Sequence, residues 1–224
     1  MIALPPAFVV SCDASRLAQF KTAWDAVGLP PNAVHEWKGV KLHGRTGDGP
    51  LGNAIAQYSL IRHAIASGFE SILVFEDDAI PCDSAAIDLP RELDAARSRG
   101  DAAIRLGWLP DSRYKLDDEE DGAILMGSHA YALLTPRAME DYCDAWTRNG
   151  KADYIFGVMM GRVGKASRCL FAQHVPSGKQ GIHFPSGWVR IHSREDLRDE
   201  HASFIKASEA IGVKPPEFSG EETK

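Results

Sequence analysis

Three consecutive acids, Glu76, Asp77 and Asp78, directly follow an apolar stretch in the segment SILVFEDDAIP (71–81). The apolar residues read as a buried strand, so three like charges stand at its end. Partly desolvated carboxylates side by side repel one another, at a cost on the order of a few kcal/mol unless a cation neutralises them. The pattern therefore predicts a positive partner at this point of the fold.

The same acids have the chemistry of a metal site. In extended backbone Glu76 and Asp78 point to one side and Asp77 to the other, so one face offers two hard oxygen ligands suited to Mg²⁺ or Mn²⁺. An ion held by two or three carboxylates keeps coordination positions for water and substrate phosphates, which predicts a phosphorylated or diphosphate substrate. The structural alternative is that one acid caps a turn at Ile80-Pro81 and another pairs with an arginine.

Strands and helices alternate along the first part of the chain. Apolar periodicity and glycine or proline stops predict a strand at 7–11, a helix that ends before Gly28, a strand at 34–40, a loop at 41–52, a helix at 53–67 and a strand at 72–75.

The second part continues the alternation. We expect a helix from Pro90 to Gly100, strands at 102–108, 123–135 and 168–175, a helix that begins at Pro136 after the capping residue Thr135, and a C-terminal amphipathic helix.

Alternating strands and helices predict an α/β fold with a mostly parallel central sheet and helices on both faces. Such sheets bind ligands at the carboxyl ends of their strands, which is where the three acids stand. We expect one domain over residues 1–213 and a disordered tail over 214–224, which has two prolines and three acids.

Composition narrows the class of protein. The 224 residues include 31 acids and 25 lysines and arginines, so the net charge of −6 argues against a nucleic-acid binder. Four widely spaced cysteines predict reduced thiols in a cytoplasmic protein. The sequence shows neither a signal peptide nor an apolar run of about 18 residues, which argues against a transmembrane segment and leaves peripheral membrane attachment open.

Three segments carry a resemblance to a known family: ASGFESILVFEDDA (66–79), GSHAYALLTPRAM (127–139) and KADYIFG (151–157). They resemble the family 25 glycosyltransferases of lipopolysaccharide and lipooligosaccharide biosynthesis, which adopt the Rossmann-like GT-A fold. The resemblance covers roughly residues 5 to 160. Where that family typically reads Gly-Cys-Ala-Leu-Ser-His, this chain reads GNAIAQ (52–57), so Ala56 and Gln57 replace the Ser-His pair.

The resemblance implies transfer of a hexose from a nucleotide-diphosphate sugar, often a UDP-hexose, to a hydroxyl of a glycan or lipooligosaccharide acceptor with inversion. It also implies a bound Mn²⁺ or Mg²⁺ ion. Asp78 is the preferred ligand and Glu76 the next candidate, with Asp77 orienting the ribose or a neighbouring cation. GT-A enzymes commonly take a third ligand from a C-terminal His or Asp, and this chain offers His174, His183 and His192. His183 is the preferred one, and Lys179 close to it would help to neutralise the diphosphate.

An inverting transferase needs a general base, and the resemblance points to Asp153 in KADYIFG. The alternative is that Asp153 caps a short helix. Asp111 and the acids of 117–121 are the next candidates for the base.

The end of the first strand lies where GT-A enzymes meet the nucleotide. Ser11, Cys12, Asp13 and Arg16 stand there, with backbone contacts to uracil and an arginine contact to phosphate as plausible roles. An N-cap role for Asp13 or Ser15 is equally open. His129 either reaches the substrate or is an interior histidine satisfied by backbone.

Two other classes of function remain open. One is a magnesium-dependent nucleotidyl or phosphoryl enzyme, although the sequence has no early glycine-rich activation loop and only Asp13 stands where a first-strand nucleophile would be. The other is a catalytically degenerate GT-A fold that binds a sugar nucleotide or a protein partner without turnover.

Overall fold

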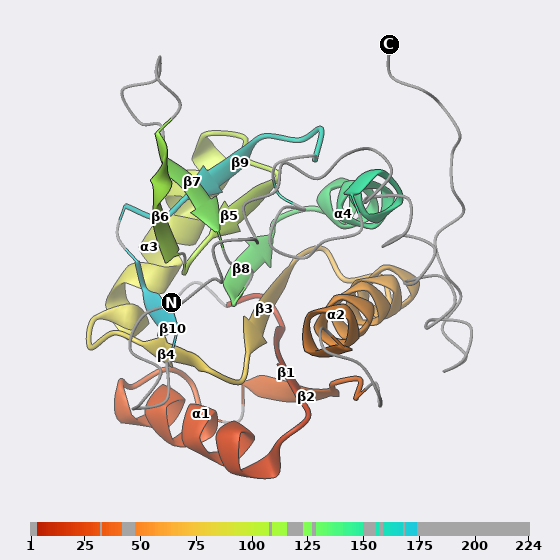
Figure 1. The fold of residues 1–224 in the computed structure, drawn as a ribbon. Coiled ribbons are helices and arrows are strands. Elements are labelled where there is room, and N and C mark those ends of the chain that lie inside the picture. Colours follow the sequence, from red (N-terminus) through yellow and green to blue (C-terminus); the bar gives the residue numbers. More distant parts are fainter. Residues whose placement is uncertain are drawn as a thin grey trace.

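A six-stranded sheet forms the centre of the fold in the computed structural model (Figure 1). The structure describes residues 4–31, 33–41, 48–107, 109–115, 123–126, 129–149, 156, 159–167 and 169–173. In sheet order the strands are β2 (Val34–Lys38), β1 (Ala7–Ser11), β3 (Ile72–Glu76), β8 (Ala130–Leu133), β5 (Ala103–Arg105) and β9 (Val163–Lys165). Only β8 runs against its neighbours in this described sheet. The predicted mostly parallel α/β sheet is therefore confirmed.

Helices cover both faces of this sheet, as predicted (Figure 1). The helices α1 (Ala14–Ala26) and α3 (Ala85–Ser98) cover one face, and α2 (Asp48–Ala66) and α4 (Pro136–Asn149) cover the other. Because successive strand residues point to opposite sides, Ile72 and Val74 pack into the core with α2 and α4, whereas Leu73 and Phe75 pack with α1 and α3. Burial on both faces explains why β3 reads as a continuous apolar run.

The order of the strands reverses at β1. The chain passes from β1 through α1 to β2 on one side, and returns through α2 to β3 on the other side of β1. Both neighbours are parallel to β1. The carboxyl ends of β1 and β3 therefore flank a topological switch point, the place where open α/β sheets form a ligand-binding crevice.

Two small antiparallel pairs flank the central sheet. In one, β6 (Leu109–Lys115) pairs with β7 (Ala123–Met126). In the other, β4 (Ala79–Pro81) pairs with β10 (Phe171–Gln173), and Gln173 lies opposite Ala79. The second pair brings a late part of the chain next to the residue that follows the acidic triplet.

Two helices begin earlier than the sequence pattern predicts. The helix α2 begins at Asp48, inside the predicted loop 41–52. Its first turn tolerates Pro50, because a missing N–H costs little there. The helix α3 begins at Ala85 and contains Pro90 rather than starting there. Ala85 and Leu89 are buried, so packing of this first turn outweighs the one backbone hydrogen bond that Pro90 cannot make.

The predicted strand at 123–135 is wrong in its extent, because the structure divides it into two strands. Its first part is β7, which pairs with β6, and its last part is β8 in the central sheet. Alternation of apolar residues cannot show such a division, because both parts are strands of ordinary length. The predicted cap after β8 is present: the Thr135 hydroxyl accepts a hydrogen bond from the Ala138 amide at 3.0 Å.

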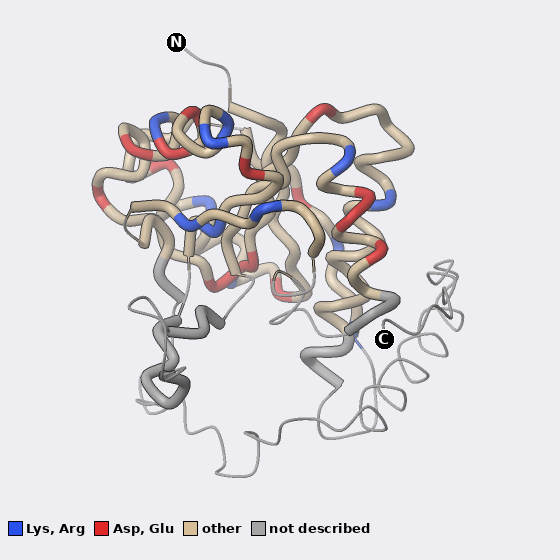
Figure 2. Tube along the Cα trace, turned by 90° about the horizontal axis from the view of Figure 1, so that it is seen from above, with Lys and Arg blue, Asp and Glu red and all other residues tan. Residues whose placement is uncertain are grey.

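Charged residues of both signs are interspersed along the described chain (Figure 2). Among the described residues, no helix combines the length and the apolar character needed to cross a bilayer. The predicted domain boundary at residue 213 and the tail after it lie outside the described residues.

Candidate functional site

The acidic triplet lies at the switch point of the sheet. Glu76 is the last residue of β3, and it lies in register with Val10 of β1, one residue before Ser11 ends that strand. Side chains that follow either strand therefore meet at one edge of the sheet.

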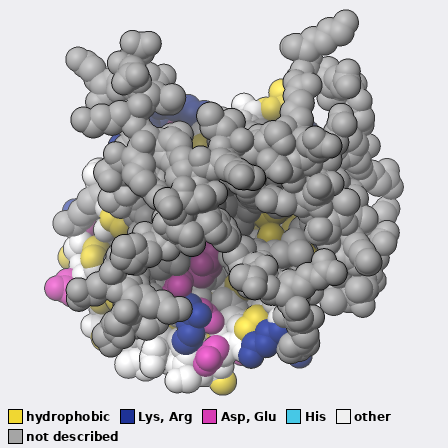
Figure 3. Space-filling model, in the orientation of Figure 1, with side chains coloured by type: hydrophobic (Ala, Val, Ile, Leu, Met, Phe, Trp, Pro, Cys, Tyr) yellow, Lys and Arg dark blue, Asp and Glu magenta, His cyan; other side chains and the backbone are white. Residues whose placement is uncertain are grey.

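One arginine joins two acids of the triplet. Nη2 of Arg16, in the first turn of α1, lies 2.6 Å from Asp77 Oδ1 and 3.0 Å from Asp78 Oδ2. The Ser11 hydroxyl donates to Asp77 Oδ2 at 2.7 Å. We call Ser11, Arg16, Asp77 and Asp78 the Arg16 cluster. It supplies the positive partner that the sequence predicts for the triplet. Acidic and basic side chains also lie side by side in the lower part of the face in Figure 3.

The expected alternation of the three acids does not extend beyond the strand. Because β3 ends at Glu76, Asp77 and Asp78 form the turn before β4 and are not extended strand residues. Asp77 and Asp78 consequently share Arg16, whereas Glu76 faces α2. The premise of that expectation, an extended backbone from Glu76 to Asp78, is corrected by this turn.

Two amides of α2 hold Glu76. Asn53 Nδ2 donates to Glu76 Oε1 at 2.8 Å, and Gln57 Nε2 donates to the same oxygen at 3.1 Å. Residues four apart lie on one face of a helix, so α2 presents both amides to the end of β3. Ala56 and Gln57 replace the Ser-His pair of the family that the sequence resembles. Of these two residues, Gln57 directly contacts the site through Glu76.

Asp13 is the N-cap of α1. Its Oδ1 accepts hydrogen bonds from the Ser15 amide at 2.8 Å and the Arg16 amide at 3.2 Å, which lower the pKa of Asp13. The capping alternative for Asp13 is therefore observed. The cap fixes the first turn of α1, from which Arg16 reaches the acids.

Burial dominates the electrostatics of Asp77. Its side chain is only 9% exposed, and this desolvation raises the pKa of Asp77, although the Ser11 hydroxyl and Arg16 act in the opposite direction. Lys38 and Lys41, at and after the end of β2, add positive charge near the neighbouring Cys12. The sequence analysis did not single out these two lysines. Their position at the carboxyl end of a strand next to β1 is the feature that could have identified them.

His129 is an interior residue that connects two strands. It is 1% exposed, and its Nε2 lies 2.9 Å from the carbonyl oxygen of Phe171 in β10. Its own carbonyl accepts from the Glu76 amide at 2.8 Å. A Cβ at Gly107 would collide with both the His129 ring and the Phe171 carbonyl, so the close approach requires glycine there. Of the two alternatives for His129, the structure shows the interior one.

Several predicted residues lie outside the described part of the chain: Asp153, His174, Lys179, His183, His192 and the acids of 117–121. Their predicted roles stay predictions, as does that of Asp111, whose side chain is not described. The described chain reaches Gln173 beside Ala79, the residue after Asp78.

The carboxylates of the triplet have the donor chemistry of a hard divalent cation such as Mn²⁺ or Mg²⁺. Arg16 pairs with both Asp77 and Asp78, so the positive charge between these two acids in the structure is a guanidinium. Within the described ranges, no group of three or more His, Cys, Asp or Glu side chains is arranged to hold a metal. An ion here therefore needs a further ligand from another part of the chain or from the substrate.

Comparisons with known proteins were made for the sequence and for the fold. No protein-family model and no curated protein matches the sequence. Among solved structures, the fold is similar to a protein from STIV, at 14% identity and a TM-score of 0.44, over 74% of this chain and 79% of that one.

Glycosyltransferases are also among these structures. One acts in glycosylation of the major capsid of PBCV-1, with 10% identity and a TM-score of 0.45 over 77% of this chain and 96% of that one. Another is a mutant β-1,4-galactosyltransferase 7 from Drosophila in complex with manganese, UDP-Gal and xylobiose, with 12% identity and a TM-score of 0.40 over 75% and 69%. At these identities and TM-scores, the matches assign neither a family nor an activity to this chain.

Proposed function

We propose that this protein is a glycosyltransferase that moves a hexosyl group from a nucleotide-diphosphate sugar, a UDP-hexose in the first instance, to a hydroxyl of a glycan or glycolipid acceptor. The observation that carries the proposal is the meeting of Ser11 and Arg16 with Asp77 and Asp78 at the switch point between β1 and β3. Open α/β sheets bind nucleotides at this position. The resemblance to the family 25 glycosyltransferases supports the same function.

The charges of the site suit a diphosphate. Within the described part of the chain, Arg16 uses one nitrogen, Nη2, for its ion pairs with Asp77 and Asp78, and its side chain is 47% exposed. A guanidinium has five N–H donors, so we propose that the remaining ones bind a phosphate oxygen of the donor. Lys38 and Lys41 extend the positive charge around the end of β2, and Ser11 and Asp13 lie beside the position proposed for the nucleoside.

In this proposal Asp78 and Glu76 hold a Mn²⁺ or Mg²⁺ ion, and His183 is the third ligand. Such an ion, when bound, would stabilise the negative charge that develops on the leaving diphosphate. Asp77 keeps Arg16 in place, and Lys179 provides further positive charge. Asp153 takes the proton of the acceptor hydroxyl, which the expected inversion requires.

The test is incubation with a panel of UDP-sugars and Mn²⁺, with release of UDP as the readout. We expect slow UDP release with one donor, and a loss of at least about two orders of magnitude in Asp78→Asn, because one proposed ligand of the ion is removed. Asp83→Asn is the matched control, since Asp83 is a nearby exposed acid.

The products separate this proposal from its rivals. Release of pyrophosphate or phosphate would identify a nucleotidyl or phosphoryl enzyme instead. Binding of a sugar nucleotide without any product, in the presence of candidate acceptors, would identify a catalytically degenerate fold. Equal UDP release by wild type and Asp78→Asn would remove Asp78 from the mechanism.

A further inference from the structure

A buried polar network connects the core between α2 and α4 to the acid at the end of β3. Gln57 Oε1 accepts from the hydroxyls of Tyr131 at 3.0 Å and Tyr142 at 2.9 Å, and the two hydroxyls lie 3.1 Å apart. On its other side, Gln57 Nε2 lies 3.1 Å from Glu76 Oε1 and 3.3 Å from Asn53 Oδ1. We call these five residues the Gln57 network.

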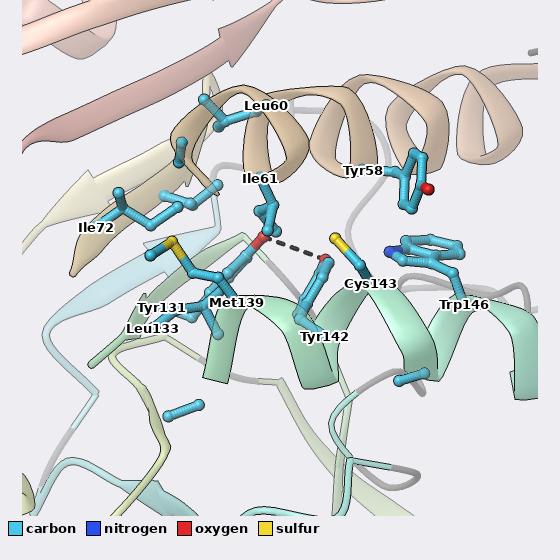
Figure 4. Close-up of a cluster of buried hydrophobic side chains, with 14 of the residues drawn as sticks. Tyr58, Leu60, Ile61, Ile72, Tyr131, Leu133, Met139, Tyr142, Cys143 and Trp146 are labelled. Carbon is cyan, nitrogen blue, oxygen red and sulfur yellow. Dashed lines mark hydrogen bonds between the residues drawn. The ribbon is translucent and has the colours of Figure 1, made fainter. Parts of the chain in front are cut away.

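The network runs through the apolar core. Gln57, Tyr131 and Tyr142 are completely or almost completely buried, at 0% exposure each. Figure 4 shows the two tyrosine hydroxyls meeting between α2 and α4, among aliphatic and aromatic side chains. Burying polar groups costs free energy unless each is hydrogen-bonded, and an apolar side chain would fill this space without that requirement. Packing of the core therefore does not by itself explain why these polar side chains are here.

The orientation of the Gln57 amide follows from its neighbours. Burial raises the pKa of Tyr131 and that of Tyr142, so both hydroxyls keep their protons. A tyrosine hydroxyl can donate to Gln57 Oε1 or accept from an amide N–H, so the contacts with Glu76 and Asn53 decide which way the amide points. A flipped amide would place its oxygen against the carboxylate of Glu76 and the carbonyl of Asn53. Nε2 must therefore face Glu76.

We propose that Gln57 is a positioning residue for Glu76: the amide, held in place by hydrogen bonds from Tyr131 and Tyr142, donates to Oε1 and fixes the plane of the carboxylate at the ligand-binding edge of the sheet. This inference rests on the proposed function for the role of Glu76, which would be one of the ligands of the ion. Hydrogen-bonded partners of a metal ligand commonly change metal affinity when they are replaced.

The first experiment measures the binding of Mn²⁺ alone to the full chain by electron paramagnetic resonance of the free ion. Gln57→Met keeps a similar shape but loses the N–H donor, and we expect Mn²⁺ to bind about 10- to 100-fold more weakly. Gln57→His restores a ring N–H donor, and we expect it to recover part of that affinity.

Leu60→Ala is the control for lost stability. Leu60 is fully buried on the same helix, and its side chain has no polar group that could bind Glu76. We expect this variant to lower stability and leave Mn²⁺ affinity within about twofold of wild type, since it changes packing alone. An equal loss of affinity in Gln57→Met and Leu60→Ala would overturn the positioning role.

A crystal structure of Gln57→Met is the second experiment, and it does not depend on a metal. We expect the Glu76 carboxylate to leave its wild-type orientation or to adopt more than one. An unchanged carboxylate overturns the inference. If the wild type binds no Mn²⁺ while Glu76 still moves in the variant, the metal role in the proposed function fails and the positioning role of Gln57 stands.

Discussion

At the scale of single residues, the site is defined by the group that each acid contacts. Arg16 lies between Asp77 and Asp78, while Glu76 accepts two amide hydrogen bonds from α2. A divalent ion that uses Asp78 therefore shares this acid with a guanidinium. Arg16 is expected to oppose the binding of the ion alone and to favour the binding of the diphosphate.

Arg16→Gln tests this competition. Removal of a positive charge next to two carboxylates is expected to tighten the binding of Mn²⁺ alone by about tenfold or more. UDP without metal is expected to bind more weakly, because a phosphate contact is lost. Titration calorimetry measures both affinities. Arg91→Gln is the control, since Arg91 is 75% exposed and pairs with Asp88 on the surface. Unchanged affinities in Arg16→Gln would separate this arginine from the ligand.

The raised pKa of Asp77 predicts a pH dependence of stability. Because burial raises this pKa above its ordinary value of 3.8, the folded protein holds the proton more tightly than the unfolded chain does. The contribution of Asp77 to stability is therefore complete below that ordinary value and is lost as pH rises through the raised pKa. Urea unfolding across this range should show that Asp77→Asn removes the decline.

Asp13 serves as a control, because its pKa is shifted in the opposite direction to that of Asp77. Its pKa is lowered by the amides of Arg16 and Ser15, so its contribution is present above the ordinary pKa and is lost as pH falls through the lowered value. Asp13→Asn should remove a loss of stability at low pH. The same slope in both variants would contradict the environments that the structure assigns to these two acids.

At the scale of elements, α4 binds the sheet through one apolar face, and this face was visible in the sequence. Met139, Tyr142 and Trp146 are all at 0% exposure and pack toward α2 (Figure 4). The predicted start at Pro136 and the cap at Thr135 are both confirmed. Long, strongly periodic segments of this kind are predictable because their burial pattern is local.

Trp146→Ala should test how much this face contributes. Deletion of a fully buried indole leaves a cavity, so we expect a loss of about 3–5 kcal/mol in the free energy of unfolding, measured with urea. Glu140→Ala on the outer face of α4 removes a surface ion pair with Arg137, and we expect a loss below about 1 kcal/mol. Similar losses in the two variants would mean that α4 does not pack as the structure shows.

Other features of the elements were not predictable from local patterns. The periodic signal alone could not show that the run 123–135 serves two different sheets, or that buried Ala85 and Leu89 start α3 before Pro90. The turn after Glu76 likewise depends on β4 pairing with the distant β10. Each of these features is decided by contacts between residues far apart in the sequence.

At the scale of the whole molecule, the order of strands places the site. The sequence predicted a mostly parallel sheet and acids at a strand end, but it could not show that β1 lies between β2 and β3. That order brings Ser11 and Arg16 to the acids. It was equally impossible to predict that Gln57 joins two tyrosines to Glu76, because these residues come from three elements beside the strand end.

The most direct test of the account is a crystal structure of the protein with UDP and Mn²⁺. The account predicts that the diphosphate lies at the carboxyl ends of β1 and β3, within hydrogen-bond distance of Arg16, with the ion bound by Asp78 and Glu76. UDP bound elsewhere on the molecule, or at this edge without contact to Arg16 or the acids, would contradict it.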